Sequence, residues 1–261
     1  MCANFGCGFA KPLPLLQKKT APTLPCDPIR AEIPALRGAE IAAVYYGQRQ
    51  SGDFYDFQRV HPQRVLFGLF DAAGHVEANR GTLCAAQSVF RKLGKQLFSQ
   101  DDINEMDAMI ELSQQLNRAV LGAEDLVRSC PAFVACYNEG YGIVCYANAG
   151  HTPGMVRDGK GVVELPATGL PFGLFSHITS EAAMVAIEPG AAMLLVSRGI
   201  IEAAHKKEEF GMERAKQALA RAGGQNAKEI CTTVLDSVRQ FMGTPPTHDD
   251  VTALSLLRAS A

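Results

Sequence analysis

Asp53 and Asp71 are acidic residues on either side of a short turn, where their carboxylates could act together. Asp53 precedes a strand-like stretch, 54–60, and Asp71 follows a second one, 64–70. Residues 61–63 between these stretches form a plausible hairpin loop. In such a hairpin the two carboxylates lie at the open end, away from the turn. The pattern therefore predicts two acidic groups at one end of a sheet.

A second pair of stretches repeats this arrangement. Arg198 ends the apolar stretch 191–197, and Asp249 and Asp250 stand immediately before the stretch 251–257. Antiparallel pairing of these stretches would bring the arginine and the two aspartates to the same end. Simple hairpin geometry does not by itself show that this end meets the one that carries Asp53 and Asp71.

Clustered carboxylates require a cation among them. Two unit charges about 4 Å apart interact at about 1 kcal/mol in water and about 4 kcal/mol at an effective dielectric constant near 20. Oxygen ligands with few histidines favour Mg²⁺ or Mn²⁺ over zinc. Taken singly, each aspartate is explained better as a turn or helix-cap residue than as a metal ligand. The combined arrangement favours a metal site.

The secondary structure expected around these residues suggests an α+β fold. Short strand-like stretches are interrupted by paired helical stretches at 77–98 and 102–121, and a further helix is expected over 227–241. Such runs favour two packed antiparallel sheets with helices outside, a four-layer α-β-β-α arrangement, over an alternating βαβ fold. The helical faces are predicted from three sets of apolar residues: Ala85, Val89 and Leu93; Met109, Leu112, Leu116 and Val120; Ile230, Val234, Val238 and Phe241. A turn is expected at 188–190.

Composition narrows the class of protein. The 261 residues are 47% apolar and carry a formal net charge of -2, which suits one domain at 39–261 preceded by a Pro-rich extension at 1–38. The near-neutral charge gives no case for nucleic acid or an anionic membrane surface. Neither a membrane-spanning run nor a secretory signal is evident, so we expect a cytoplasmic protein. Cysteines 84, 130, 136, 145 and 231 lie in apolar patterns and are expected to be buried thiols, whereas cysteines 2, 7 and 26 match no zinc spacing.

Five segments in order carry a family resemblance: SGDFYDF, FDAAGH, YANAGHTPG, LLVSRGIIEA and HDDVTAL. Together they resemble the bacterial SpoIIE-type branch of the metal-dependent protein phosphatases, over roughly residues 33–258. The resemblance implies a β-sandwich with flanking helices and a two-metal centre at one end. It also implies phosphoserine or phosphothreonine regulatory proteins as substrates, often anti-anti-sigma factors, hydrolysed by water that the metal ions activate.

Roles for individual residues follow from the same resemblance. Asp53 would hold water on the first ion, Asp71 would bridge both ions, and the carbonyl of Ala72 would complete part of the first site. Asp249 would bind the second ion, with Asp250 beside it. These roles are implied by the family, whereas the residue pattern alone indicates only that the carboxylates gather.

Arg198 departs from the family, which has an aspartate ligand of the second ion there. Arginine remains protonated and has no acceptor atom, so it cannot bind a cation. Three outcomes are open: Arg198 pairs with Asp71 and Asp249 as a built-in cation, it clamps a substrate phosphate beside one ion, or it turns to solvent. Ser51 and Val76 replace family glycines, with smaller consequences.

The two histidines in FDAAGH and NAGH, His75 and His151, could each face the site as an acid catalyst or serve a structural role. The sequence thus supports a Mg²⁺- or Mn²⁺-dependent phosphoprotein phosphatase with a weakened second metal site. The alternative is a pseudophosphatase that binds a phosphorylated partner without turnover. A purely structural domain that oligomerises through the extension is a third hypothesis. The oligomeric state is not predicted.

Overall fold

The computed structural model describes residues 32–46, 51–75, 79–123, 129–177, 179–223, 226–243 and 251–260. The side chains of residues 51 and 73–75 are not described. The predicted extension therefore falls almost wholly outside the described residues, which begin shortly before the first strand.

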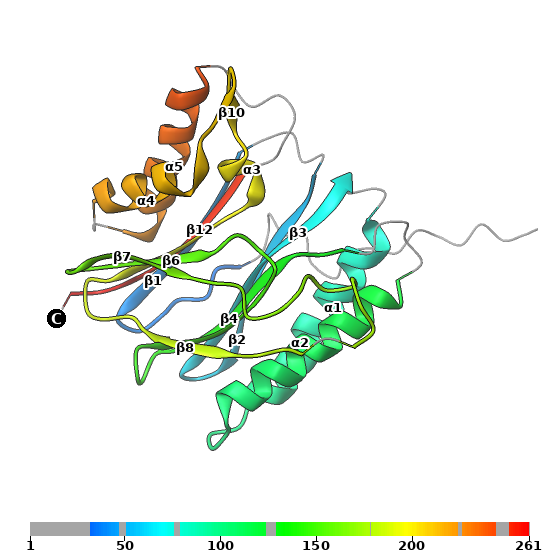
Figure 1. The fold of residues 1–261 in the computed structure, drawn as a ribbon. Helices are drawn as coiled ribbons and strands as arrows, with labels where there is room; N and C mark the ends of the chain where they lie inside the picture. Colours follow the sequence, from blue (N-terminus) through cyan, green and yellow to red (C-terminus); the bar gives the residue numbers. More distant parts are fainter. Residues whose placement is uncertain are drawn as a thin grey trace, which may run out of the picture.

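Two five-stranded sheets pack face to face (Figure 1). One sheet has the order β2-β3-β4-β5-β8 and the other the order β1-β12-β9-β6-β7. Neighbouring strands in both sheets are antiparallel. The strands of the first sheet are β2 Ser51–His61, β3 Arg64–His75, β4 Ala132–Asn138, β5 Ile143–Ala149 and β8 Ala183–Ala186. Those of the second are β1 Ala39–Tyr46, β6 Gly154–Asp158, β7 Gly161–Leu165, β9 Ala192–Val196 and β12 Val251–Arg258.

Helices cover the outer face of each sheet, which completes the four-layer α-β-β-α fold (Figure 1). The first sheet carries α1 Arg80–Phe98 and α2 Glu105–Leu121, and the second carries α4 Gly211–Arg221 and α5 Ala227–Met242. A short helix, α3 Arg198–Ile201, follows β9, and a two-stranded ribbon follows it, β10 Ala204–His205 with β11 Glu208–Glu209. Three apolar clusters fill the spaces between these four layers. The fold class is the one that the sequence predicts.

The predicted helical faces agree with the structure in two helices and fail in the third. The apolar residues expected on α2 and α5 are buried, with Phe241 partly exposed. On α1 the buried face is instead centred on Leu83, Ala86 and Phe90. Val89 and Leu93, which we expected at its centre, lie at the edge of the core cluster. Apolar residues at four-residue spacing form two neighbouring stripes on this helix. The stripe that carries the larger Phe90 ring is the one that is buried.

The turn at 188–190 joins the two sheets. The N–H of Ala191 donates to the carbonyl of Glu188 at 2.8 Å, so the predicted turn is present. The strands on either side of it do not pair with each other, because β8 pairs with β5 and β9 pairs with β12 and β6. The chain thus crosses from one sheet to the other here, which sequence pattern alone does not indicate.

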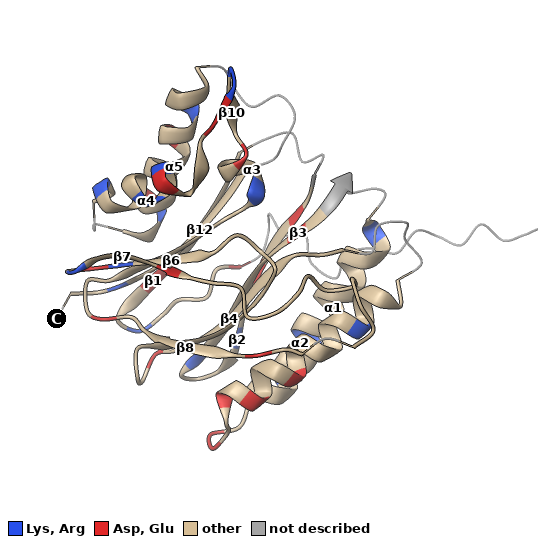
Figure 2. Cartoon of the chain, in the orientation of Figure 1, with Lys and Arg blue, Asp and Glu red and all other residues tan. Residues whose placement is uncertain are grey.

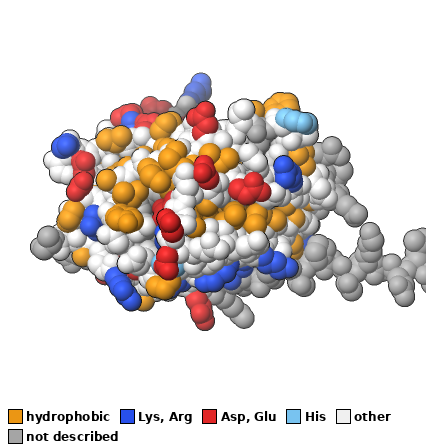
Figure 3. Space-filling model, turned by 90° about the horizontal axis from the view of Figure 1, so that it is seen from below, with side chains coloured by type: hydrophobic (Ala, Val, Ile, Leu, Met, Phe, Trp, Pro, Cys, Tyr) orange, Lys and Arg blue, Asp and Glu red, His pale blue; other side chains and the backbone are white. Residues whose placement is uncertain are grey.

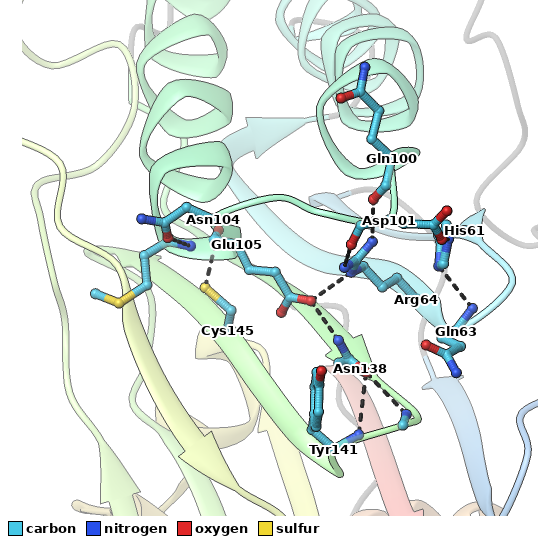
Figure 4. Close-up of polar contacts among 12 residues, drawn as sticks. His61, Gln63, Arg64, Gln100, Asp101, Asn104, Glu105, Asn138, Tyr141 and Cys145 are labelled. Atoms are coloured by element: carbon cyan, nitrogen blue, oxygen red, sulfur yellow. Dashed lines mark hydrogen bonds and ion pairs between the residues drawn. The ribbon is translucent and has the colours of Figure 1, made fainter.

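A buried polar network closes the end of the sandwich that carries the β2–β3 turn (Figure 4). Oε1 of Glu105 accepts from Nε of Arg64 at 2.6 Å and from Nδ2 of Asn138 at 2.7 Å. The two remaining Arg64 nitrogens donate to the carbonyls of Gln100 and Asp101. Arg64 and Glu105 are 6% and 8% exposed. The network ties the α1–α2 connection to the strands below it, and each charged group in it has a partner.

The outer surface at this end mixes apolar and acidic side chains (Figure 3). Exposed large apolar residues include Met106, Tyr141 and Met184. Among the described residues, none of the helices has the length and apolar character needed to span a bilayer.

Candidate metal centre

The β2–β3 hairpin sets Asp53 directly opposite Asp71. Directly opposed residues project from the same face of an antiparallel pair, with Cβ atoms about 4.5–5.5 Å apart. Because Phe67 and Leu69 of β3 belong to the core between the sheets, alternation places Asp71 on that inner face as well. The carboxylates of Asp53 and Asp71 therefore project from one face, at the open end of the hairpin.

Aromatic packing supports this pair from behind. The neighbouring residues Phe54 and Phe70 also face each other across the strands, and their rings stack at 4.3 Å on the opposite face. Phe90 of α1 packs edge-on against Phe70 at 5.7 Å. Such buried rings fix the strands on which Asp53 and Asp71 stand.

Asp56 points away from the site, as its three-residue offset from Asp53 predicts. Its carboxylate accepts from Nε and Nη2 of Arg91 at 2.6 and 2.5 Å and from Nε2 of Gln87 at 3.2 Å. Asp56 is fully buried. It therefore anchors α1 to β2 and does not contribute to the carboxylate pair.

Gly52 brings the backbones of β2 and β3 unusually close. A Cβ at position 52 would overlap the carbonyl oxygen of Ala72. The register also shifts between Ser51 and Gly52, which pair with His75 and Ala72. Only glycine allows this approach, so the position of the Ala72 carbonyl depends on the residue that precedes Asp53.

Arg198 joins the second sheet to this pair. It begins α3 directly after β9, and its backbone N–H donates to Oδ2 of Asp71 at 3.2 Å. Nη2 lies 3.6 Å from Oδ1 of Asp71, and Nε lies 3.9 Å from Oε1 of Glu202. The Arg198 side chain is 49% exposed. Figure 2 shows the basic start of α3 across from an acidic position on the β2–β3 hairpin. The two strand ends therefore meet, and the arginine contacts the carboxylate.

The predicted pairing of β9 with β12 is present, with Ala253 opposite Val196. Beyond it, Thr252 N–H donates to Oγ of Ser197 at 3.0 Å. Asp249 and Asp250 lie outside the described residues. Within the described ranges, no three His, Cys, Asp or Glu side chains come together in a group that could hold a metal ion.

His151 and Cys130 lie beside the carboxylate pair. His151 is 5% exposed, and burial lowers its pKa; Asp71 opposes this shift and Arg198 adds to it. Burial raises the pKa of the Cys130 thiol far above its usual range, and the charges of Asp71 and Asp53 raise it further. Cys130 is therefore a protonated thiol, not a nucleophile. The cysteines expected to be buried are all buried.

The donor set fits one ion better than two. Asp53 and Asp71 offer hard oxygen atoms from one face of the hairpin, which suits Mg²⁺ or Mn²⁺. The family resemblance implies a carboxylate ligand of the second ion at position 198, and the guanidinium of Arg198 contacts Asp71 instead. A second ion would therefore have to displace a positive charge, so the residues do not fit it.

Solved structures with the same architecture define the class of fold. The RsbU and RsbW domains of Rv1364c from Mycobacterium tuberculosis match with a TM-score of 0.70 and 19% identity, over 87% of this chain and 62% of that one. The PP2C phosphatase domain of SpoIIE from Bacillus subtilis, solved with a fragment of its regulatory domain, matches with a TM-score of 0.69 and 16% identity, over 85% and 62%. The fold is that of PP2C-type phosphatase domains.

The chain belongs to the family described as stage II sporulation protein E (SpoIIE), whose model matches residues 61–258. It is also 22% identical over 153 residues to phosphoserine phosphatase RsbP of Bacillus subtilis strain 168. That match covers 58% of this chain and 37% of RsbP, so the chain spans well under half of that relative's length.

Two features of the site were not predicted. One is the contact of the Arg198 backbone N–H with Asp71, which depends on α3 beginning directly at β9. The other is Cys130, which reads as an ordinary buried thiol in the sequence. The NAGH motif did single out His151, but left its catalytic and structural roles open.

Proposed function

We propose that this chain is a serine/threonine phosphoprotein phosphatase domain that uses one divalent ion, Mg²⁺ or Mn²⁺, and acts in the cytoplasm on a phosphorylated regulatory protein. The observation that carries the proposal is the pairing of Asp53 with Asp71 on the inner face of the hairpin end. Asp53, Asp71 and the carbonyl of Ala72 would hold the ion, with Asp249 and Asp250 as further ligands that the family resemblance implies. Bound there, the ion would lower the pKa of water and neutralise phosphate charge.

Arg198 supplies the phosphate-binding part of this proposal. Its guanidinium is half exposed, and its 3.6 Å contact with Asp71 is longer than a direct charge-assisted hydrogen bond. A phosphate dianion can offer the guanidinium a bidentate partner. Arg198 would thus orient the phosphoserine group, while the chain loses the charge stabilisation that a second ion provides.

Phosphate release from a phosphoserine peptide, with and without Mn²⁺, tests the proposal. We expect slow, Mn²⁺-dependent release by the wild type and a loss of about 100-fold or more in Asp71→Asn. Arg198→Asp restores the family's ligand type and is expected to raise the rate about 10-fold or more, with one additional bound ion. Metal-independent release, or none above background in both the wild type and Arg198→Asp, would refute it.

The ion pair between Arg198 and Asp71 favours a second candidate, a pseudophosphatase. In that case Arg198 acts as a permanent cation, and the domain recognises a phosphorylated partner without hydrolysing it. Calorimetry with the same peptide separates the two: binding without release, weakened by Arg198→Ala, supports the pseudophosphatase. Stoichiometric phosphate release rejects it.

A further inference from the structure

A groove of about 280 Å³ lies between α4 and α5, the two helices that cover the outer face of the second sheet (Figure 1). Its α4 wall is a stripe at three- and four-residue spacing that includes Arg214, Ala218 and Arg221. Because the central residue of this stripe is an alanine, its side chain does not fill the space between the helices. The opposite wall is the C-terminal part of α5, which includes Phe241.

The groove carries positive charge. The charged side chains in its described lining are those of Arg214 and Arg221, and no carboxylate is among them. Arg221 is exposed, and its guanidinium has no hydrogen bond or ion pair with any residue that the structure describes. Arg214 pairs with Glu208 at 2.9 Å, but these two side chains are 43% and 71% exposed. Because an exposed pair is weak, a carboxylate from another protein can replace Glu208.

An aromatic surface adjoins the first of these arginines. The guanidinium carbon of Arg214 lies 4.6 Å from the centre of the Phe241 ring, and Phe210 packs against the same ring at 5.6 Å. Nη1 of Arg214 donates to the carbonyls of Glu209 and Phe210 at 2.7 and 3.2 Å. These contacts fix the guanidinium before any ligand binds, which reduces the conformational entropy lost on binding. The groove thus has adjoining places for a carboxylate and an apolar side chain.

The spacing of the two arginines favours a helical ligand. Arg214 and Arg221 are seven positions apart on α4, which is about two turns or 10 Å along the helix axis. The contacts of Arg214 with residues 208–210 hold its guanidinium on the side away from Arg221. A single small anion is therefore too short to contact both. A helix repeats the same spacing, and two neighbouring helices provide ridges against which a third can pack.

We propose that the groove between α4 and α5 binds an acidic amphipathic helix of a partner protein. Two acidic side chains of that helix would contact Arg214 and Arg221, and an apolar side chain between them would cover the exposed part of the Phe241 ring. The groove lies on the outer face of the second sheet, whereas Asp53 and Asp71 project between the sheets. The inference is therefore independent of the proposed function.

Fluorescence anisotropy with the full chain and a labelled, hydrocarbon-stapled helical peptide tests the proposal. The peptide has about 15 residues, with two glutamates seven positions apart and leucines between them. We expect binding that weakens as the salt concentration rises, and an affinity about 10-fold or more lower in Arg221→Glu. The matched control is Arg239→Glu, the same charge change on α5 outside the groove, which should lower the affinity less than about threefold.

Changes in the peptide provide a measurement that needs no protein variant. A peptide with both glutamates replaced by lysine should not bind the wild type. Of the two peptides with a single lysine, one should bind Arg221→Glu about 10-fold more tightly than the original peptide does, because it restores an opposite charge at that position.

Three results would overturn the proposal. The first is no binding of the glutamate peptide at up to about 1 mM, or equal losses in Arg221→Glu and Arg239→Glu. The second is displacement of the peptide by about 10 mM inorganic phosphate at constant ionic strength, which would indicate a simple anion site. The third is self-association of the wild type that Arg221→Glu abolishes, since a second copy of the chain would then occupy the groove.

Discussion

The two ends of the β2–β3 hairpin differ in the partners of their buried polar and charged groups. At the turn end, the Arg64–Glu105 pair is enclosed, and Asn138 and two backbone carbonyls take up the remaining hydrogen-bonding groups (Figure 4). At the open end, Asp71 has a half-exposed arginine at 3.6 Å, and Nε2 of the neighbouring His151 has no partner among the described residues. Each charged group of the Arg64–Glu105 network has a partner, whereas one ring nitrogen of His151 has none among the described residues.

This difference indicates which end of the hairpin stabilises the fold and which end is available for ligand binding. Removing one member of a buried ion pair costs about 3–5 kcal/mol, because the other charge is left without compensation. An exposed pair contributes about 0–1 kcal/mol. The turn end should therefore govern unfolding, whereas groups at the open end remain available to ligands. Four predictions test this contrast.

The largest effect is expected for Glu105→Ala. It leaves the guanidinium of Arg64 buried and removes the acceptor of Asn138, so the free energy of unfolding should fall by about 3–5 kcal/mol. Urea denaturation followed by circular dichroism measures this. Asp107→Ala, on the exposed side of the same helical turn, serves as the control and should cost less than about 1 kcal/mol. Equal losses in the two variants would show that the buried network does not stabilise this end.

The next effect is a pH dependence that His151 introduces. Because burial lowers the pKa of the folded ring, the unfolded chain takes up a proton first as pH falls below about 6.5. Stability is therefore complete above that pH and declines below it, at no more than about 1.4 kcal/mol per pH unit for this group. Urea midpoints between pH 5 and 7.5 should slope less in His151→Gln. Identical slopes would contradict the buried neutral ring.

Asp71→Asn should change stability by less than about 1 kcal/mol, because the guanidinium of the half-exposed Arg198 lies 3.6 Å away and asparagine keeps an acceptor for the Arg198 N–H. This small change contrasts with the large loss of phosphate release expected from the same variant. Thermal unfolding and the Mn²⁺-dependent assay, run on one preparation, check both. A stability loss comparable to that of Glu105→Ala would place Asp71 among the structural charges.

The smallest effect is expected for Asp101→Ala. Its carboxylate is 95% exposed and lies 2.7 Å from Nε2 of His61, next to the buried network. Its removal should cost less than about 0.5 kcal/mol, since exposed pairs are well screened. Urea midpoints at low and high salt should barely separate this variant from the wild type. A loss above about 1 kcal/mol would extend the stabilising network to the surface.

Much of the fold could be predicted because local patterns were strong. Met109, Leu112, Leu116 and Val120 define the buried face of α2, and the hairpin around residues 61–63 sets Asp53 opposite Asp71. Helix α4 was not predicted, because its first turn follows a short charged ribbon and its buried residues are mostly alanine. The Arg64–Glu105 pair was also missed, since its members are 41 positions apart and each resembles an ordinary surface charge.

The sequence identified the residues of the site better than it predicted the contacts between them. Motif order indicated Asp53, Asp71 and Arg198, and the structure brings these three to one end. The ring nitrogen of His151 that carries the hydrogen could not be predicted. Nδ1 lies beside Oγ1 of Thr152, and that hydroxyl donates its proton to the carbonyl of Val196, 44 positions further along the chain. Asp249 and Asp250 stay a prediction.

The close approach of Gly52 to Ala72 links two parts of the site mechanically. Because a Cβ at position 52 would overlap the Ala72 carbonyl oxygen, any larger residue there has to displace that carbonyl or the start of β2. A substitution of Gly52 would therefore change the position of a carbonyl ligand while every acidic side chain of the site stays the same.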